Sequence, residues 1–180
     1  YLDAAELVAN ARVPAHIRDA IALGGFAGFN KLDEVGRPIG VRGIVAGDQT
    51  RRVIARTLAQ THVREIEAAT SPAQLAIGTR VGLEAAIHTA RTSLELDHSK
   101  VLISLDGIGA YDHIKRKAMF DRLAQLPRAR EMIPFLLMFY GRVSRYVYVL
   151  ETGEVKEILQ GDGGEQGDAL MPELFALGLD

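Results

Sequence analysis

The sequence of 180 residues has 21 lysines and arginines against 23 aspartates and glutamates, which gives a formal net charge of −2. This balance argues against a uniformly basic nucleic-acid-binding protein, and the 48% of hydrophobic residues argues against a disordered or fibrous chain. The absence of cysteine excludes disulfides, thiolate zinc sites and thiol nucleophiles.

The first half of the chain is predicted to contain four helices and one hairpin. Apolar residues recur there at helical spacing, and Pro14 and Asp48 stand where helices commonly begin. The elements, in chain order, are helices at 3–12 and 14–23, a hairpin of 29–32 and 37–41 around a turn at 33–36, a helix after Asp48 that buries Val53, Ile54, Leu58, Ala59, Val63 and Ile66, and a helix after Gly82 through Ala85, Ile87, Ala90 and Leu94.

The second half adds one central strand. Residues 101–105 are mostly apolar, which is typical of a strand covered on both faces, and the run ends at Asp106. Helices and hairpins around one strand indicate the α+β class. The remaining elements are a helix that buries Ile114, Ala118, Leu123 and Leu126, an apolar helix at 132–140, a hairpin of 146–149 and 155–158, and a helix at 171–177.

Charge is unevenly distributed along the chain. Residues 36–64 contain six arginines and one acid, and residues 112–145 contain eight basic residues and three acids. Residues 151–180 contain eight acids and one lysine. Two basic segments and one acidic segment are compatible with a positive groove beside an acidic centre, or with solvated faces that have no binding role.

No targeting or membrane segment is visible. The sequence has no apolar run of about 18 residues, and its first six residues lack the basic and apolar regions of a secretory signal. These features favour an intracellular protein without a membrane partner. We expect the chain to be part of a longer protein, because it lacks an initiator methionine and stops within an apolar run.

Asp106 is the first candidate functional residue. A carboxylate at the end of a buried strand, together with backbone carbonyls, suits a hard cation such as Mg²⁺. The alternative is that Asp106 and Gly107 form a turn in which the aspartate caps the next helix.

Two further candidates are the Gln166-Gly167-Asp168 segment and the pair Lys31 and Arg37. The first follows a glycine-rich stretch, so its backbone can approach a ligand, or it is a loop that ends at an N-cap. Lys31 and Arg37, on facing strands of the predicted hairpin, suit a polyphosphate, or they are edge charges that prevent aggregation.

Other catalytic patterns are absent from the sequence. The five histidines show no metal-ligand spacing, and neither a Gly-x-Ser-x-Gly elbow nor a Walker A loop occurs. Asp112 is interpreted as a surface or capping residue. Tyr140, Tyr146 and Tyr148 are interpreted as packing residues rather than a stacking platform for bases.

The order of these segments resembles the reverse transcriptase domain of non-LTR retrotransposons and similar retroelements. The resemblance rests on Lys31 with Arg37-Pro38-Ile39, on the segment from Leu105 to Asp112, and on the segment from Gln166 to Phe175. It covers nearly the whole chain. It implies an RNA-directed DNA polymerase, a nucleotidyltransferase whose partners are an RNA or DNA template with its primer and a deoxynucleoside triphosphate.

The resemblance also implies a right-hand polymerase fold with fingers, a partial palm and no thumb. Residues 1–98 would form the fingers, and 99–117 the palm strand with its metal-binding aspartate. Residues 118–165 would return to the fingers with a hairpin, and residues 166–180 would re-enter the palm.

Residue roles follow from the same resemblance. Asp106, assisted by the Gly107 carbonyl, would bind magnesium in a site that takes two ions when complete. Lys31 and Arg37 would hold the triphosphate. The remaining roles are those of Tyr111, which would exclude a ribose 2′-hydroxyl, of Gln166, which would contact the nucleotide, and of Gly167, which would leave room for it.

The sequence departs from the family pattern in one important respect. It contains no Asp-Asp pair, whereas the family supplies further metal ligands from an aromatic-x-Asp-Asp motif. We therefore expect the chain alone to be inactive and the longer parent protein to carry the polymerase activity. Ala169, where proline is common, and Gly163-Gly164-Glu165 are smaller departures. They leave open a catalytically decayed nucleic-acid-binding module with the same fold.

Overall fold

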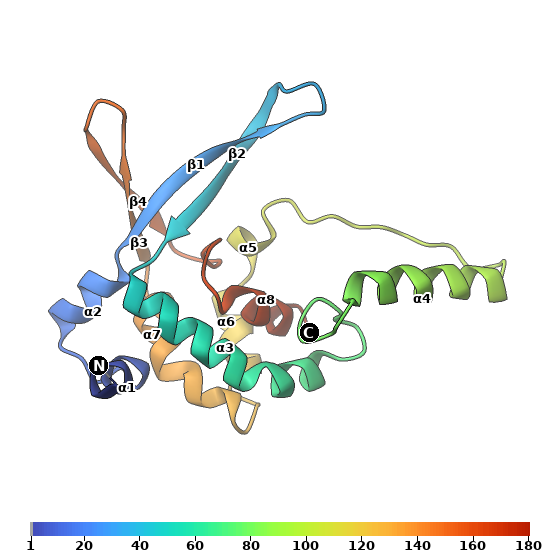
Figure 1. The fold of residues 1–180 in the computed structure, drawn as a ribbon, viewed down its shortest axis with the longest axis horizontal. Coiled ribbons are helices and arrows are strands. Elements are labelled where there is room, and N and C mark those ends of the chain that lie inside the picture. The colour runs from blue at the N-terminus through green and yellow to red at the C-terminus, as the bar shows by residue number, and fades with distance from the viewer. Residues whose placement is uncertain (1) are drawn as a thin grey trace.

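The computed structural model of the protein describes residues 2–180 and confirms the mixed α+β class (Figure 1). A body of packed helices carries two projecting β-hairpins, and α4 with the segment that follows it extends away from the body. In chain order the elements are α1 (Leu2–Ala9), α2 (Ala15–Ala22), β1 (Gly24–Leu32), β2 (Pro38–Ala46), α3 (Gln49–Thr70), α4 (Gly82–Leu96), α5 (Ala110–His113), α6 (Arg116–Leu123), the 3₁₀ helix η1 (Ala129–Met132), α7 (Ile133–Tyr140), β3 (Ser144–Val149), β4 (Val155–Gln160) and α8 (Met171–Leu179).

The two hairpins form one four-stranded sheet in the order β2-β1-β3-β4. Each hairpin is antiparallel, and they join through a short parallel pairing in which Gly24 lies opposite Tyr146 and Gly25 opposite Val147. A Cβ atom at Gly24 would lie 2.5 Å from the Val45 side chain, so glycine permits this junction. Both predicted hairpins are confirmed, and their strands extend further toward the helical body than predicted.

Helix α3 is the longest helix of the body. The Asp48 carboxylate accepts hydrogen bonds from the backbone N–H groups of Thr50 and Arg51, so the predicted N-cap is confirmed. The buried face includes Ile54, Ala59 and Ile66, as the spacing predicts. Val53 was wrongly predicted to be buried, because it lies on the outer face of the helix.

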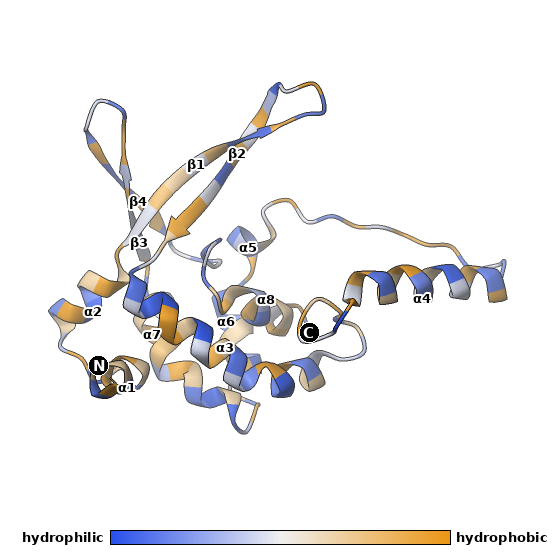
Figure 2. Ribbon diagram, in the orientation of Figure 1, coloured by the Kyte–Doolittle hydropathy of each residue, from blue (hydrophilic) through white to orange (hydrophobic). Residues whose placement is uncertain are grey.

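Helices α6, α7 and α8 complete the core. Leu123, Phe135 and Leu177 are almost fully buried, and α7 is apolar along its length (Figure 2). Helix α8 approaches α6 closely, because a Cβ atom at Gly178 would lie only 3.0 Å from Met119. The predicted helix at 171–177 is confirmed, whereas the helix predicted after Asp106 is divided into α5 and α6, and the one at 132–140 into η1 and α7.

The strand predicted at residues 101–105 is wrong. These residues are irregular and exposed, with Leu105 at 91% of its full accessible surface. None of the four strands offers this run a hydrogen-bonding partner, and an apolar pattern alone cannot satisfy a strand's backbone groups. Helix α4 forms as predicted, but none of its residues is buried.

Within residues 2–180, we find no helix with the length and apolar character needed to span a membrane.

Candidate functional site

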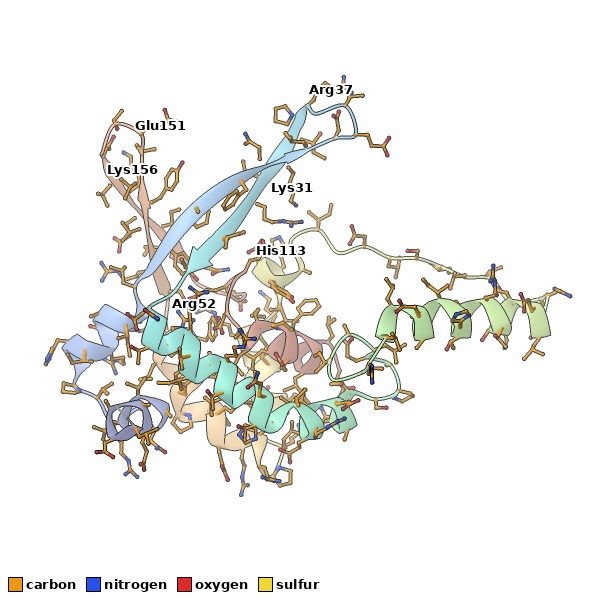
Figure 3. All side chains as sticks on the ribbon, in the orientation of Figure 1. Lys31, Arg37, Arg52, His113, Glu151 and Lys156 are labelled. Atoms are coloured by element: carbon orange, nitrogen blue, oxygen red, sulfur yellow. The ribbon has the colours of Figure 1, made fainter. Side chains whose placement is uncertain are left out.

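A pocket of about 370 Å³ lies between the first hairpin, the segment before α6 and the loop before α8. We call it the Gln166 pocket. Figure 3 shows Lys31 on the hairpin, on the side toward α5, where His113 is labelled. The residues that line the pocket are Lys31, Val41, Arg42, Gly43, Asp106, Gly107, Gly109, Ala110, Tyr111, Asp112 and Gln166.

Five of the residues assigned by resemblance therefore share one pocket although they are far apart in the sequence. They are Lys31, Asp106, Gly107, Tyr111 and Gln166. Their convergence does not depend on the predicted strand, since Asp106 lies in exposed irregular backbone rather than at the end of a buried strand.

Arg37 lies outside the lining of this pocket. Its side chain is 77% exposed in the turn of the hairpin, where its Nε lies 2.8 Å from an Asp33 carboxylate oxygen. It does not sit on a strand facing Lys31, because β2 begins only at Pro38 and Lys31 lies opposite Gly40. This ion pair satisfies Arg37 locally.

Arg42 lines the pocket and was missed by the sequence reasoning. In the register of the hairpin, Arg42 lies opposite Phe29, one strand repeat from the Lys31–Gly40 pair. Alternate residues of a strand share a face, so Lys31 and Arg42 are diagonal neighbours on the same face. Correct strand pairing would have identified Arg42 as the second cation.

The loop before α8, residues 163–169, forms one wall of the pocket, and we call it the strap. It is fastened to the Tyr111 segment by backbone hydrogen bonds: Gly163 N–H donates to Ile114 C=O, and Gly164 N–H to Tyr111 C=O. Gly163 has φ +72°, and a Cβ atom there would lie 2.3 Å from the Asp112 carbonyl oxygen. Gly163 thus has a structural reason to be glycine.

The strap is also fastened to the first hairpin. Val45 N–H donates to Gln166 C=O at 2.9 Å, which fixes the backbone that carries the Gln166 side chain. Gly167 has φ +125°, and a Cβ atom there would lie 2.5 Å from the Val45 carbonyl oxygen. Gly167 therefore allows close backbone contact with the hairpin, and it faces a different pocket from Gln166.

Arg51 forms ion pairs with the two residues that flank Gln166 and Gly167, which are Glu165 and Asp168. Its Nη2 lies 2.7 Å from Glu165 and 3.0 Å from Asp168, and all three side chains are almost fully buried. Its guanidinium carbon also lies 4.0 Å from the centre of the Phe139 ring. Burial lowers the pKa of Arg51, but the charges of Glu165 and Asp168 more than offset this, so the net pKa is raised.

Two of the tyrosines belong to the same buried region. The Tyr140 hydroxyl donates to Asp168 at 2.6 Å, and burial raises its pKa well above the usual value. The Tyr146 hydroxyl hydrogen-bonds to Gln160 at 2.6 Å. Tyr140 and Tyr146 are buried, which confirms the prediction that they are packing residues.

Tyr111 presents a partly buried ring at the pocket. The ring packs against Phe175, with centroids 5.1 Å apart. Burial, and then the nearby charge of Glu173, raise the pKa of the Tyr111 phenol. The residue is therefore an uncharged, positioned ring at neutral pH.

The acidic side of the pocket contains two carboxylates, those of Asp106 and Asp112. Within residues 2–180 no three His, Asp or Glu side chains form a group that could hold a metal ion by themselves. Mg²⁺ commonly binds through one or two carboxylates, its own waters and substrate phosphates. The residues of this pocket that offer oxygen donors to such an ion are Asp106, Asp112 and, through its carbonyl, Gly107.

Comparison with known proteins adds no assignment: the chain matches no protein-family model and no curated protein.

Proposed function

We propose that the chain is part of an RNA-directed DNA polymerase of the retroelement type. Such an enzyme adds deoxynucleotides to a primer 3′ end by two-metal phosphoryl transfer. The observation that supports this proposal is the Gln166 pocket, in which Lys31, Asp106, Gly107, Tyr111 and Gln166 converge.

The chemistry of the pocket suits a deoxynucleoside triphosphate bound with magnesium. Lys31 and Arg42 offer positive charge to the phosphates from one side, and Asp106 and Asp112 offer oxygen ligands from the other. In the reaction the primer 3′-oxygen attacks the α-phosphorus, and pyrophosphate leaves with the electrons of the broken P–O bond. Bound magnesium would neutralise the charge that develops on the attacking and leaving oxygens.

Catalysis requires more than this pocket. A two-metal site needs further carboxylates, and the sequence has no Asp-Asp pair to supply them. We therefore assign nucleotide binding to this chain, and primer extension to a polypeptide that combines it with an aromatic-x-Asp-Asp motif.

Titration of the chain with dATP in the presence of Mg²⁺ tests the proposal. We expect Mg²⁺-dependent binding that is weakened by Lys31→Gln and by Asp106→Asn. Lys156→Gln is the matched control, because it removes a lysine from the other hairpin (Figure 3) and should leave binding unchanged. Tyr111→Ala should reduce discrimination between dATP and ATP, because it removes the ring that would meet the 2′-hydroxyl.

Two results would contradict the proposal. The first is that dATP binding is absent or independent of Mg²⁺, and the second is that K31Q and K156Q behave alike. Binding of a nucleic-acid strand without Mg²⁺-dependent nucleotide binding would support instead the alternative, a decayed nucleic-acid-binding module.

A further inference from the structure

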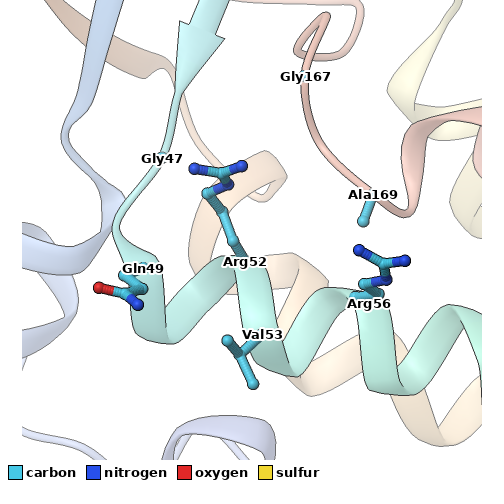
Figure 4. Close-up of a pocket in the computed structure, with 7 residues that line it drawn as sticks. All are labelled: Gly47, Gln49, Arg52, Val53, Arg56, Gly167 and Ala169. Atoms are coloured by element: carbon cyan, nitrogen blue, oxygen red, sulfur yellow. The ribbon is translucent and has the colours of Figure 1, made fainter.

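A second pocket, of about 410 Å³, lies on the other side of the strap from the Gln166 pocket. Figure 4 shows that Arg52 and Arg56, on successive turns of α3, direct their guanidinium groups into it. Gly167 and Ala169 of the strap lie across from the two arginines, and Gly47, just before α3, also lines the pocket. We call it the Arg52–Arg56 pocket.

The two arginines of this pocket have no anionic partner among residues 2–180. No carboxylate lies within 4.0 Å of either guanidinium group, and no acidic residue lines the pocket. Their neighbour Arg51 points inward and takes Glu165 and Asp168. Like charges one helical turn apart repel each other, so a bound anion would relieve a repulsion that the protein leaves in place.

The side chains, rather than the end of the helix, create this positive site. Asp48 already accepts from the backbone N–H groups of Thr50 and Arg51 at the start of α3. Arg52 and Arg56 therefore supply the free donors. Two planar guanidinium groups suit the oxygens of a phosphate, which they can bind in a bidentate manner.

The position of the pocket favours a phosphate that belongs to a nucleic-acid strand. Gln166 lines one pocket and its sequence neighbour Gly167 lines the other, so both pockets border the same part of the strap. Every nucleotide of a strand carries a phosphate, so a bound strand places a series of negative charges along its path. A strand with one nucleotide at the Gln166 pocket therefore carries neighbouring phosphates close to Arg52 and Arg56.

We propose that the Arg52–Arg56 pocket binds the phosphodiester backbone of an unpaired nucleic-acid strand beside the Gln166 pocket. The proposal rests on the proposed function, in which this strand is the template. The pocket contributes affinity without sequence preference, because a phosphate contact carries no base information. A free nucleotide offers the same phosphate chemistry, so the test separates the two sources.

Fluorescence anisotropy with a short labelled oligothymidine strand, in a salt titration, tests the proposal. R52Q/R56Q should weaken strand binding by roughly tenfold. It should also reduce the magnitude of the slope of log affinity against log salt by about 0.7 for each phosphate contact that is lost. R52K/R56K should restore most of the slope, because it keeps the charges. The affinity for dATP with Mg²⁺ should be unchanged in both variants.

R128Q/R130Q is the matched control. It removes two exposed arginines at and beside η1 that do not line the pocket, and it should leave strand binding unchanged. Circular dichroism should show that every variant remains folded, because all four side chains are exposed.

The outcomes separate this inference from the proposed function. Equal effects of R52Q/R56Q and R128Q/R130Q on strand binding would overturn the proposal that the Arg52–Arg56 pocket binds the strand. A loss of dATP binding in R52Q/R56Q, with strand binding intact, would overturn it as well. A wild-type protein that binds dATP with Mg²⁺ but binds no strand would overturn only this inference. A wild-type protein that binds the strand through Arg52 and Arg56, but binds no dATP with Mg²⁺, would overturn only the polymerase assignment.

Discussion

One wall of the Gln166 pocket, the strap, is held by buried ion pairs and close glycine contacts, whereas the wall that carries Asp106 is exposed backbone. Arg51 of α3 holds the strap through ion pairs with two strap residues, Glu165 and Asp168. By contrast, the chain from residue 97 to residue 109 has no strand or helix, and its apolar residues face solvent. The comparison indicates that residues which line the same pocket can differ widely in how firmly the fold positions them.

The largest effect is expected from breaking the Arg51 ion pairs. Arg51→Met should lower the free energy of unfolding by about 3–5 kcal/mol, because it leaves the buried carboxylates of Glu165 and Asp168 without a counter-charge. Urea unfolding followed by circular dichroism measures this loss. Arg52→Met, an exposed neighbour on the same helix, should change stability by less than about 0.5 kcal/mol.

The same comparison corrects the expected role of the basic segment 36–64. Arg51 belongs to this segment by sequence, but its charge is used within the protein and is not available to a nucleic acid. If R51M and R52M proved equally stable, the strap would not depend on the ion pairs.

A second large effect is expected where the strap meets the Tyr111 segment. Gly163→Ala should destabilise the protein by about 2–3 kcal/mol, because φ is +72° and the new Cβ would lie 2.3 Å from the Asp112 carbonyl oxygen. Gly153→Ala is the matched control: φ is +81° there, but no atom lies within 4 Å of the added Cβ. The difference between the two unfolding free energies isolates the close contact from the backbone strain.

Sequence analysis predicted the residues that line the Gln166 pocket better than the interactions that hold them in place. The order of Lys31, Asp106, Tyr111 and Gln166 was sufficient to select residues that share one pocket. The strap's ion pairs were not predictable, because Arg51 lies 114 and 117 positions from its two partners. Periodicity describes neighbours within one element, and it carries no information on contacts between distant segments.

The missing strand has a similar cause. Residues 101–105 have the composition of a buried strand, but composition does not supply a neighbouring strand with free backbone groups. The hairpins were predicted more successfully because each contains its own pairing partner within a few residues.

A smaller, pH-dependent effect is expected at Asp162, just before the strap. This carboxylate accepts from Lys115 Nζ at 2.7 Å and from Arg116 N–H at 2.9 Å. The Lys115 hydrogen bond is the main reason that the pKa of Asp162 is lowered to about 2. Because the folded-state pKa is depressed, the stabilisation is complete above the usual pKa near 4 and is lost as the pH falls toward 2.

Asp162→Asn should therefore cost about 1 kcal/mol at pH 7, a modest value because the side chain is 41% exposed to solvent. The difference from the wild type should narrow between about pH 4 and pH 2. Unfolding free energies of the two proteins across this range provide the measurement. A difference that stays constant with pH would show that the charge of Asp162 does not stabilise the strap.

The smallest effect is expected on the exposed wall. Ile103→Ser and Leu105→Ser should each change the unfolding free energy by less than about 0.5 kcal/mol, because both side chains already face water in the folded protein. Leu123→Ser, a fully buried leucine in α6, is the contrasting variant and should cost several times more. Amide hydrogen exchange at residues 101–108 should be fast, since these residues form no strand ladder. Exchange at Gly163 and Gly164 should be slow, because both residues are buried and their N–H groups donate to the carbonyls of Ile114 and Tyr111. Slow exchange at 101–108, or a cost above about 2 kcal/mol for Leu105→Ser, would mean that this segment is packed as firmly as the strap, and the contrast between the two walls would then fail.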